Sequence, residues 1–171
     1  GDVYKRQDNQ AGGAELVRHL IDRGHTKIAG YFKSDDIQGH QRYSGFISEL
    51  FRSGLIIPDE NVFWYTTETK ENLFDDPEEV LKRLGDNTAV VCYNDEVAFG
   101  LVKCLLSAGR RVPEDVAVVS FDNSNLSWIS QVPITSLSYE DRNIGRIAAQ
   151  KLVVILDGRD VSSEVLPWTF I

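Results

Sequence analysis

The sequence predicts an α/β protein built on a doubly wound parallel sheet. Segments of strand character and segments with helical apolar spacing alternate along nearly the whole chain. The strand-like segments are continuous apolar runs, which is typical of strands buried on both faces. Such strands pair in parallel through right-handed helical crossovers. A hydrophobic content of 42% and a charged content of 26% are ordinary for a globular protein with a substantial core.

The first half of the chain supplies helices and strands in alternation. The pattern predicts a helix at residues 12–23, a strand at 27–32, a helix at 38–53, a strand at 61–66 and a helix at 77–84. In the first helix Leu16, Val17 and Leu20 lie on one face, and Gly24 ends it. Each helix therefore has an apolar face available to cover a sheet.

The second half continues the alternation. The pattern predicts a strand at 88–93, a helix at 95–108, a strand at 116–121, a short strand at 134–137 and a helix at 142–156. Gly109 and Gly158 follow the two helices and end them. Strand and helix thus succeed each other as in repeated βαβ units.

Charge and composition exclude several classes of function. The formal net charge is −8, and an acidic surface repels phosphate backbones, so we expect no direct DNA contact from this stretch. No apolar run approaches the length of a membrane span. The two cysteines, Cys92 and Cys104, lie in apolar segments, and we expect both to be buried free thiols.

Polar residues cluster directly after three of the predicted strands. Lys33, Asp36 and Gln38 follow the strand at 27–32, and Arg42 lies one turn into the next helix. Asn94 and Asp95 follow the strand at 88–93, and Asp122 follows the strand at 116–121. Ligands of open α/β sheets bind at the carboxyl ends of the strands. Carboxylate, amide and guanidinium groups pair with adjacent hydroxyls, so this set suits a small neutral polyol.

Each of these residues also has a structural interpretation. Asp95 and Asp122 could be helix N-caps, and Arg42 could lie on a solvated helix face. Lys33 could form a surface ion pair with Asp35. Asn94 remains open between a structural role and a ligand contact. It is the shared position at strand ends that favours a site.

The sequence contains no recognisable catalytic or cofactor motif. The three histidines have no metal-site spacing, and no nucleophile elbow, phosphate-binding loop or dinucleotide fingerprint is present. Asp35 and Asp36 could in principle act as acid and base, but adjacent side chains diverge and no nucleophile stands near them. We therefore expect no enzyme activity, no cofactor and no metal.

Four ordered motifs resemble the sensor domain of LacI/GalR-type repressors. They are GHTKIAG at 24–30, RYSGF at 42–46, CYNDEVA at 92–98 and VPEDVAVVSFDN at 112–123. The resemblance implies a periplasmic binding protein-like fold with a sugar cleft between two lobes. It places sugar contacts on Arg42, Asn94 and Asp122.

Within that family, three segments look most like the arabinose-responsive repressors of Gram-positive bacteria. They are FKSDDIQG at 32–39, YTTE at 65–68 and CYNDE at 92–96. This resemblance implies L-arabinose as the ligand and a winged helix-turn-helix of the GntR kind elsewhere in the protein. It adds Lys33, Asp36 and Gln38 to the expected sugar contacts, with Thr67 as a further candidate.

Residues 1–7 show no apolar period and lead abruptly into the first predicted helix, so we interpret them as a non-native scar. The resemblance implies that residues 8–171 are a truncated effector domain without the DNA-binding domain. Residues 27–122 are expected to form most of the C-terminal lobe. Residues 8–24 and 135–171 are expected to associate with the N-terminal lobe or the hinge, and the first half of the N-terminal lobe is missing.

The expected function is that of a cytoplasmic repressor, homodimeric at full length and without membrane contact. Sugar in the cleft would release operator DNA, which a missing N-terminal domain would bind. One alternative is a periplasmic sugar-binding protein of an uptake transporter, which shares the fold but needs a secretion signal. A second alternative is an unrelated α/β enzyme, which needs a catalytic pair that we do not find.

Overall fold

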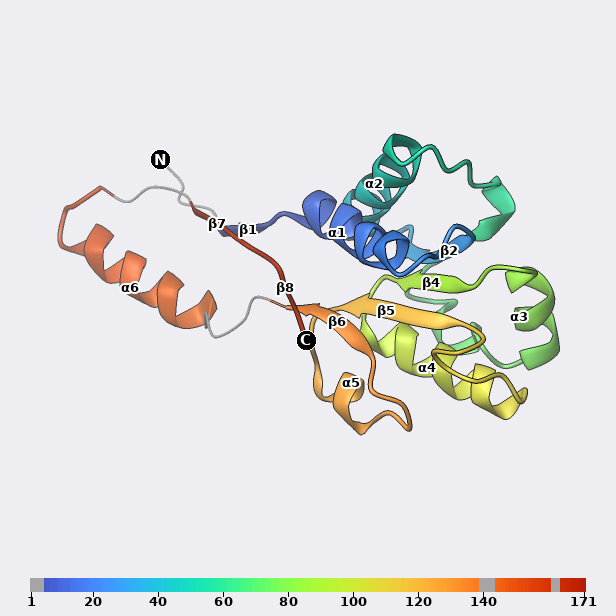
Figure 1. Ribbon diagram of the computed structural model, residues 1–171. Coiled ribbons are helices and arrows are strands. Elements are labelled where there is room, and N and C mark those ends of the chain that lie inside the picture. The colour runs from blue at the N-terminus through green and yellow to red at the C-terminus, as the bar shows by residue number, and fades with distance from the viewer. Residues whose placement is uncertain (1–4, 139–143, 161–163) are drawn as a thin grey trace.

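In a computed structural model, a six-stranded sheet with helices on both faces forms the body of the protein (Figure 1). The structure describes residues 5–138, 144–160 and 164–171. The strand order is β3-β2-β4-β5-β6-β8, in which the first five strands are parallel and β8 is antiparallel to β6. The predicted α/β class with a mainly parallel sheet is confirmed.

The elements follow the predicted order, with additions at the ends. The strands of the large sheet are β2 (Ile28–Lys33), β3 (Val62–Tyr65), β4 (Ala89–Cys92), β5 (Ala117–Phe121), β6 (Thr135–Ser138) and β8 (Thr169–Phe170). The helices are α1 (Asn9–Asp22), α2 (Ile37–Arg52), α3 (Pro77–Leu84), α4 (Asp95–Ser107), α5 (Asn125–Ile129) and α6 (Ile144–Leu156). Two short 3-10 helices, at Asp59–Asn61 and Lys70–Asn72, flank β3.

We did not predict α5 or β8, because both are too short to show a period. Residues 142 and 143 of the helix expected at 142–156 lie outside the described residues.

Two apolar layers hold the helices to the sheet. Successive residues of one strand point to opposite faces. Val91 of β4 therefore packs with α1 and α2, while Val90 and Cys92 pack with α3 and α4. Figure 1 shows these helix pairs on opposite sides of the sheet. Cys92 and Cys104 are buried free thiols, as predicted.

Helices α1 and α2 cross at very short range through two glycines. A Cβ atom at Gly13 would lie 2.1 Å from the Arg42 carbonyl oxygen, and one at Gly45 would lie 1.8 Å from the Gln10 carbonyl oxygen. Side chains at these positions would push the backbones apart. This contact fixes α1 to α2 and to the large sheet.

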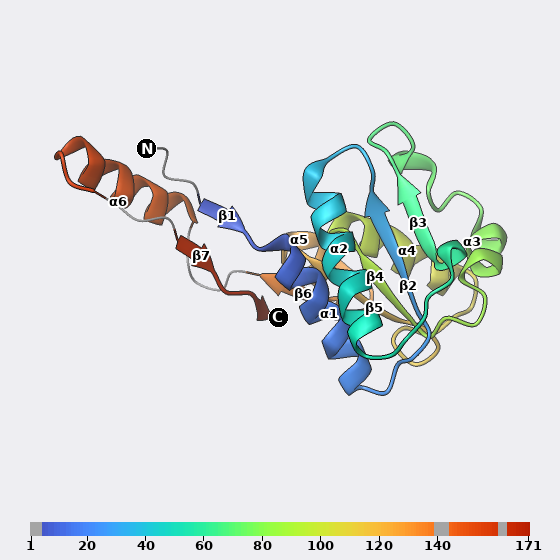
Figure 2. The same cartoon turned by 90° about the horizontal axis from the view of Figure 1, so that it is seen from above.

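The two ends of the chain lie partly in the body and partly outside it. Helix α1 and strands β6 and β8 belong to the large body. Residues 5–7 form β1 (Lys5–Gln7), which pairs in parallel with β7 (Glu164–Leu166). This pair and α6 stand away from the body (Figures 1 and 2). On α6, Leu152, Val153, Ile155 and Leu156 are exposed. The association of residues 8–24 and 135–171 with a second lobe or hinge, and the non-native origin of residues 1–7, remain predictions.

Candidate ligand-binding site

The loops after β2, β4 and β5 meet at one edge of the sheet, because parallel strands end on the same side. The sequence-predicted residues lie in these loops and at the starts of α2 and α4, except for Thr67, which follows β3. Five of them form two groups. Lys33, Asp36 and Gln38 lie in the first group, and Arg42 and Asp122 lie in the second.

Asp36 is the centre of the first group. It is the N-cap of α2, and its Oδ1 accepts the backbone N–H of Gly39 at 2.7 Å. Its Oδ2 lies 3.3 Å from the Lys33 ammonium and accepts the Tyr93 hydroxyl at 2.7 Å. Partial burial opposes ionisation of Asp36, but the hydrogen bonds from Tyr93, Gly39 and Lys33 outweigh it and lower the pKa. Asp36 is thus held as a carboxylate.

Arg42 is the centre of the second group. The side chain is 2% exposed, which excludes the solvated helix face as its environment. Its Nε donates to Asn9 Oδ1 at 3.0 Å, its Nη1 to the Tyr93 carbonyl, and its Nη2 to Asp122 Oδ1 at 3.1 Å. The guanidinium carbon lies 4.2 Å from the Phe121 ring centroid. A buried cation with this many partners is fixed in one orientation.

Asp122 presents a carboxylate at the end of β5 on an unusual backbone. Its φ is 97° and that of Asn123 is 46°, and non-glycine residues rarely adopt such values. Although 42% of its side chain is exposed, loss of hydration beside neighbouring groups raises its pKa, and Arg42 opposes this rise. Asp122 is not a helix cap, since the side chain that caps α5 is that of Ser124.

Asn94 and Asp95 have structural roles that the sequence did not distinguish. Asn94, and not Asp95, is the N-cap of α4, and its Oδ1 accepts the Val97 N–H at 3.1 Å. Asp95 is 1% exposed and accepts the hydroxyls of Ser120 and Ser136. It also accepts the backbone N–H of Ser124. The expected cap role for Asp95 is therefore wrong, and its carboxylate joins α4 to β5, β6 and α5.

Thr67 lies beside the first group through its backbone. Its N–H donates to Asp35 Oδ2 at 2.9 Å, and hydrogen bonding from Thr67 is the main cause of a lowered pKa of Asp35. Lys33 lies 3.6 Å from Asp35 as well as 3.3 Å from Asp36, so the surface ion pair considered above is present. The contacts draw the loops after β2 and β3 together.

Sequence reasoning missed Tyr93 and Asn9. Tyr93 contacts both groups, and Asn9 is a buried partner of Arg42. Tyr93 could have been predicted as a site residue, because it is an aromatic residue at a strand end and directly precedes Asn94. For Asn9 there was no such signal, because it lies ahead of the helix that the apolar spacing predicted.

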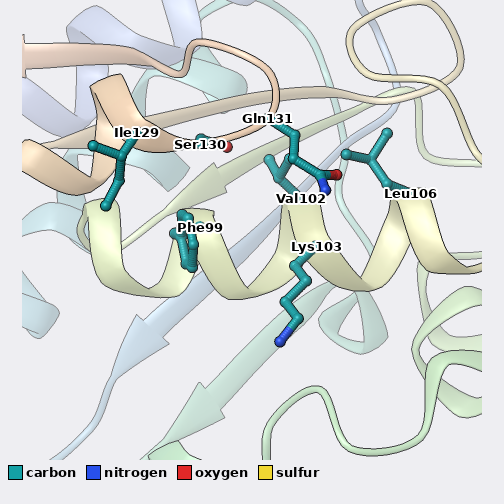
Figure 3. Close-up of a pocket in the computed structure, with 7 residues that line it drawn as sticks. All are labelled: Phe99, Val102, Lys103, Leu106, Ile129, Ser130 and Gln131. Carbon is teal, nitrogen blue, oxygen red and sulfur yellow. The ribbon is translucent and has the colours of Figure 1, made fainter.

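One hollow of the surface lies apart from the two polar groups. Figure 3 shows a hollow between α4 and α5 that is lined by Phe99, Val102, Lys103, Leu106, Ile129, Ser130 and Gln131. Its residues differ from those of the two polar groups. The described residues contain no cluster of three or more His, Cys, Asp or Glu side chains that could hold a metal ion. In the same residues, the helices are too short or too polar to cross a membrane.

A family model and curated relatives both place the chain among periplasmic binding protein-like domains of transcription regulators. The model of the periplasmic binding protein-like domain matches residues 17–170. The arabinose metabolism transcriptional repressor of Halalkalibacterium halodurans is 38% identical over 152 residues, which cover 86% of this chain and 40% of that protein. The repressor of the same name from Geobacillus stearothermophilus is 35% identical over 159 residues, covering 91% of this chain and 44% of that protein.

A solved structure agrees with these relatives. It is a sugar-binding transcriptional regulator of the LacI family from Escherichia coli, complexed with phosphate. It superposes with a TM-score of 0.85 at 25% identity, covering 99% of this chain and 60% of that chain. The present chain thus spans less than half the length of the two curated relatives.

Proposed function

This chain belongs to the periplasmic binding protein-like domain family, in the form found in LacI-type transcription regulators; from that premise, we propose that it is the sugar-sensing part of a bacterial repressor. The observation that carries the proposal is the convergence of two polar groups at one edge of the sheet. Their carboxylates, amide and cations match the donors and acceptors of a polyol.

The proposed sugar is L-arabinose. Two relatives that share 38% and 35% identity with the chain are named arabinose metabolism repressors. The polar loop at residues 33–39, which resembles that of arabinose-responsive repressors, contains Lys33, Asp36 and Gln38. Lys33, Asp36, Gln38, Arg42 and Asp122 are the proposed contacts, and Asn94 and Thr67 extend the set.

The proposed mechanism is an allosteric switch and not catalysis. Sugar would bind between this body and a second lobe of the full-length protein, and so favour one lobe arrangement. A ligand shifts such an equilibrium only by its differential affinity for the two arrangements. In the cytoplasm, a homodimer carrying DNA-binding domains would then release its operator. Reciprocal linkage requires operator DNA to weaken sugar binding by the same factor.

Calorimetric titration of the full-length gene product tests the proposal. L-arabinose, D-ribose, D-galactose and D-glucose are titrated separately, and we expect saturable heat with L-arabinose. Heat with another sugar alone would overturn arabinose and leave the sugar sensor standing. Absence of heat with all four would count against a site for these sugars. Periplasmic transport, the rival function, is not favoured by relatives that are named as transcription regulators.

A further inference from the structure

Tyr93 lies between the two polar groups and contacts both. Its hydroxyl donates to Asp36 Oδ2 at 2.7 Å and lies 3.4 Å from Gln38 Oε1. Its carbonyl oxygen accepts Arg42 Nη1, and the Arg42 guanidinium carbon lies 5.0 Å from its ring centroid. One residue at the end of β4 thus holds side chains from the loop after β2 and from the first turns of α2.

The contacts of Tyr93 are of a kind that fixes orientation. A hydroxyl that donates to a carboxylate makes a charge-assisted bond, which is about twice as strong as a neutral one. The residue is 8% exposed, so little water competes for the bond. Burial and the Asp36 hydrogen bond both raise the pKa of Tyr93, so its hydroxyl keeps its proton at neutral pH.

Tyr93 fixes the position of one of the two carboxylate oxygens of Asp36. Its Oδ1 is occupied by the Gly39 N–H, and its Oδ2 is shared by Tyr93 and Lys33. The Lys33 ammonium is shared with Asp35, from which it lies 3.6 Å, and a lysine carries its charge on a flexible four-carbon chain. Tyr93 is therefore the rigid partner of Oδ2.

We propose that Tyr93 is a positioning residue of the sugar site, which holds the Asp36 carboxylate in the orientation that a bound sugar requires. This inference rests on the proposed function. It predicts that the hydroxyl of Tyr93, and not only its ring, contributes to sugar affinity. Removal of the hydroxyl frees Asp36 Oδ2 from its rigid partner while the main-chain bond to Arg42 remains.

Tyr65 provides a matched control. It is 2% exposed, its ring centroid lies 6.1 Å from that of Tyr93, and its hydroxyl has no hydrogen-bond partner among the residues that the structure describes. Tyr65→Phe therefore removes the same atom from β3, which β2 separates from β4, without removing a hydrogen bond between described residues. Loss of an unsatisfied buried hydroxyl is expected to be neutral or stabilising.

The experiment compares Tyr93→Phe with Tyr65→Phe in the full-length protein. Aspartate carboxyl carbons are labelled with ¹³C, and the Asp36 signal is assigned by its loss in Asp36→Asn. The ionisable groups that face Asp36 are Lys33, Tyr93 and, farther away, Tyr65. We expect the pKa of Asp36 to rise in Tyr93→Phe only. Calorimetry is expected to show L-arabinose affinity about tenfold weaker in Tyr93→Phe and unchanged in Tyr65→Phe.

Three outcomes would overturn the inference. An unchanged Asp36 midpoint in Tyr93→Phe means that the hydroxyl does not hold this carboxylate. A shifted midpoint with unchanged sugar affinity means that the contact is structural alone. No binding of any sugar by the unaltered protein removes the proposed function and this inference together, and the Asp36 midpoint then still reports whether the contact exists.

Discussion

Arg42 and Asp122 are 80 residues apart in the sequence and form an ion pair with 3.1 Å between Nη2 and Oδ1. The same guanidinium reaches Asn9 and the Tyr93 carbonyl and lies over the Phe121 ring. One side chain therefore ties the start of α1 to the ends of β4 and β5. This explains why an arginine on a helix is 2% exposed.

Arg42→Ala should weaken both sugar binding and the fold. It leaves Asp122 and the Tyr93 carbonyl without their cation, and we expect a loss of about 3 kcal/mol in the free energy of unfolding. We also expect at least tenfold weaker L-arabinose binding, measured by calorimetry below the unfolding temperature. The control is Arg83→Ala, because Arg83 is exposed and lies 4.6 Å over the Phe63 ring in another part of the sheet. Sugar affinity that does not change in Arg42→Ala removes Arg42 from the site.

Asp95→Ala should destabilise the protein without a direct effect on the ligand. It removes the common acceptor of the Ser120 and Ser136 hydroxyls, which are both fully buried. We expect a loss of about 3 kcal/mol, and a smaller loss in Asp95→Asn, which keeps one acceptor oxygen. Urea unfolding measures both. Glu96→Ala is the control, since Glu96 forms an exposed ion pair with Lys70. Equal losses at positions 95 and 96 would contradict the prediction.

Gly45→Ala should separate α1 from α2. The added Cβ would lie 1.8 Å from the Gln10 carbonyl oxygen, so the backbones must move. Alanine normally favours a helix over glycine by about 1 kcal/mol, yet overpacking here should reverse the sign to a loss of about 3 kcal/mol. Thermal and urea unfolding measure the change. Ser48→Ala lies on the exposed side of the same helix and should have little effect. A Gly45→Ala protein as stable as the parent would show that the helices are not in contact there.

Asp115→Asn should remove part of the acid sensitivity of the fold. The carboxylate accepts the side chain and the backbone N–H of Arg111, which lower the pKa of Asp115 to about 2. The unfolded value is about 3.9, so the contribution to stability is present above that pH and is lost between about 3.9 and 2. The difference in unfolding free energy between parent and variant should therefore shrink as the pH falls through this window. The exposed neighbour variant Glu114→Gln should show a smaller difference. If the difference in unfolding free energy between parent and Asp115→Asn does not depend on pH, the lowered pKa of Asp115 is not a source of acid sensitivity.

The order of elements and the family follow from the sequence alone. Helical spacing, continuous apolar runs and terminal glycines are local signals, so α2, β4 and α4 were predicted close to their observed bounds. The motif at 112–123 has mainly a core role, because β5 is fully buried and only Asp122 at its end reaches the site. The loop at 33–39 was correctly placed at a strand end, where Lys33 and Asp36 meet.

Tertiary structure alone decided which polar side chains meet. A local pattern shows that a residue follows a strand, but it carries no information on which strand is the neighbour or where a side chain finds its partner. Asn94 and Asp95 are adjacent in the sequence, yet one caps α4 and the other joins three serines. Tyr93 acquires its role because the pairing of β2 with β4 brings Asp36 and Arg42, from the start of α2, into contact with it. The sequence determined the elements and their buried faces, and the pairing of strands determined the site.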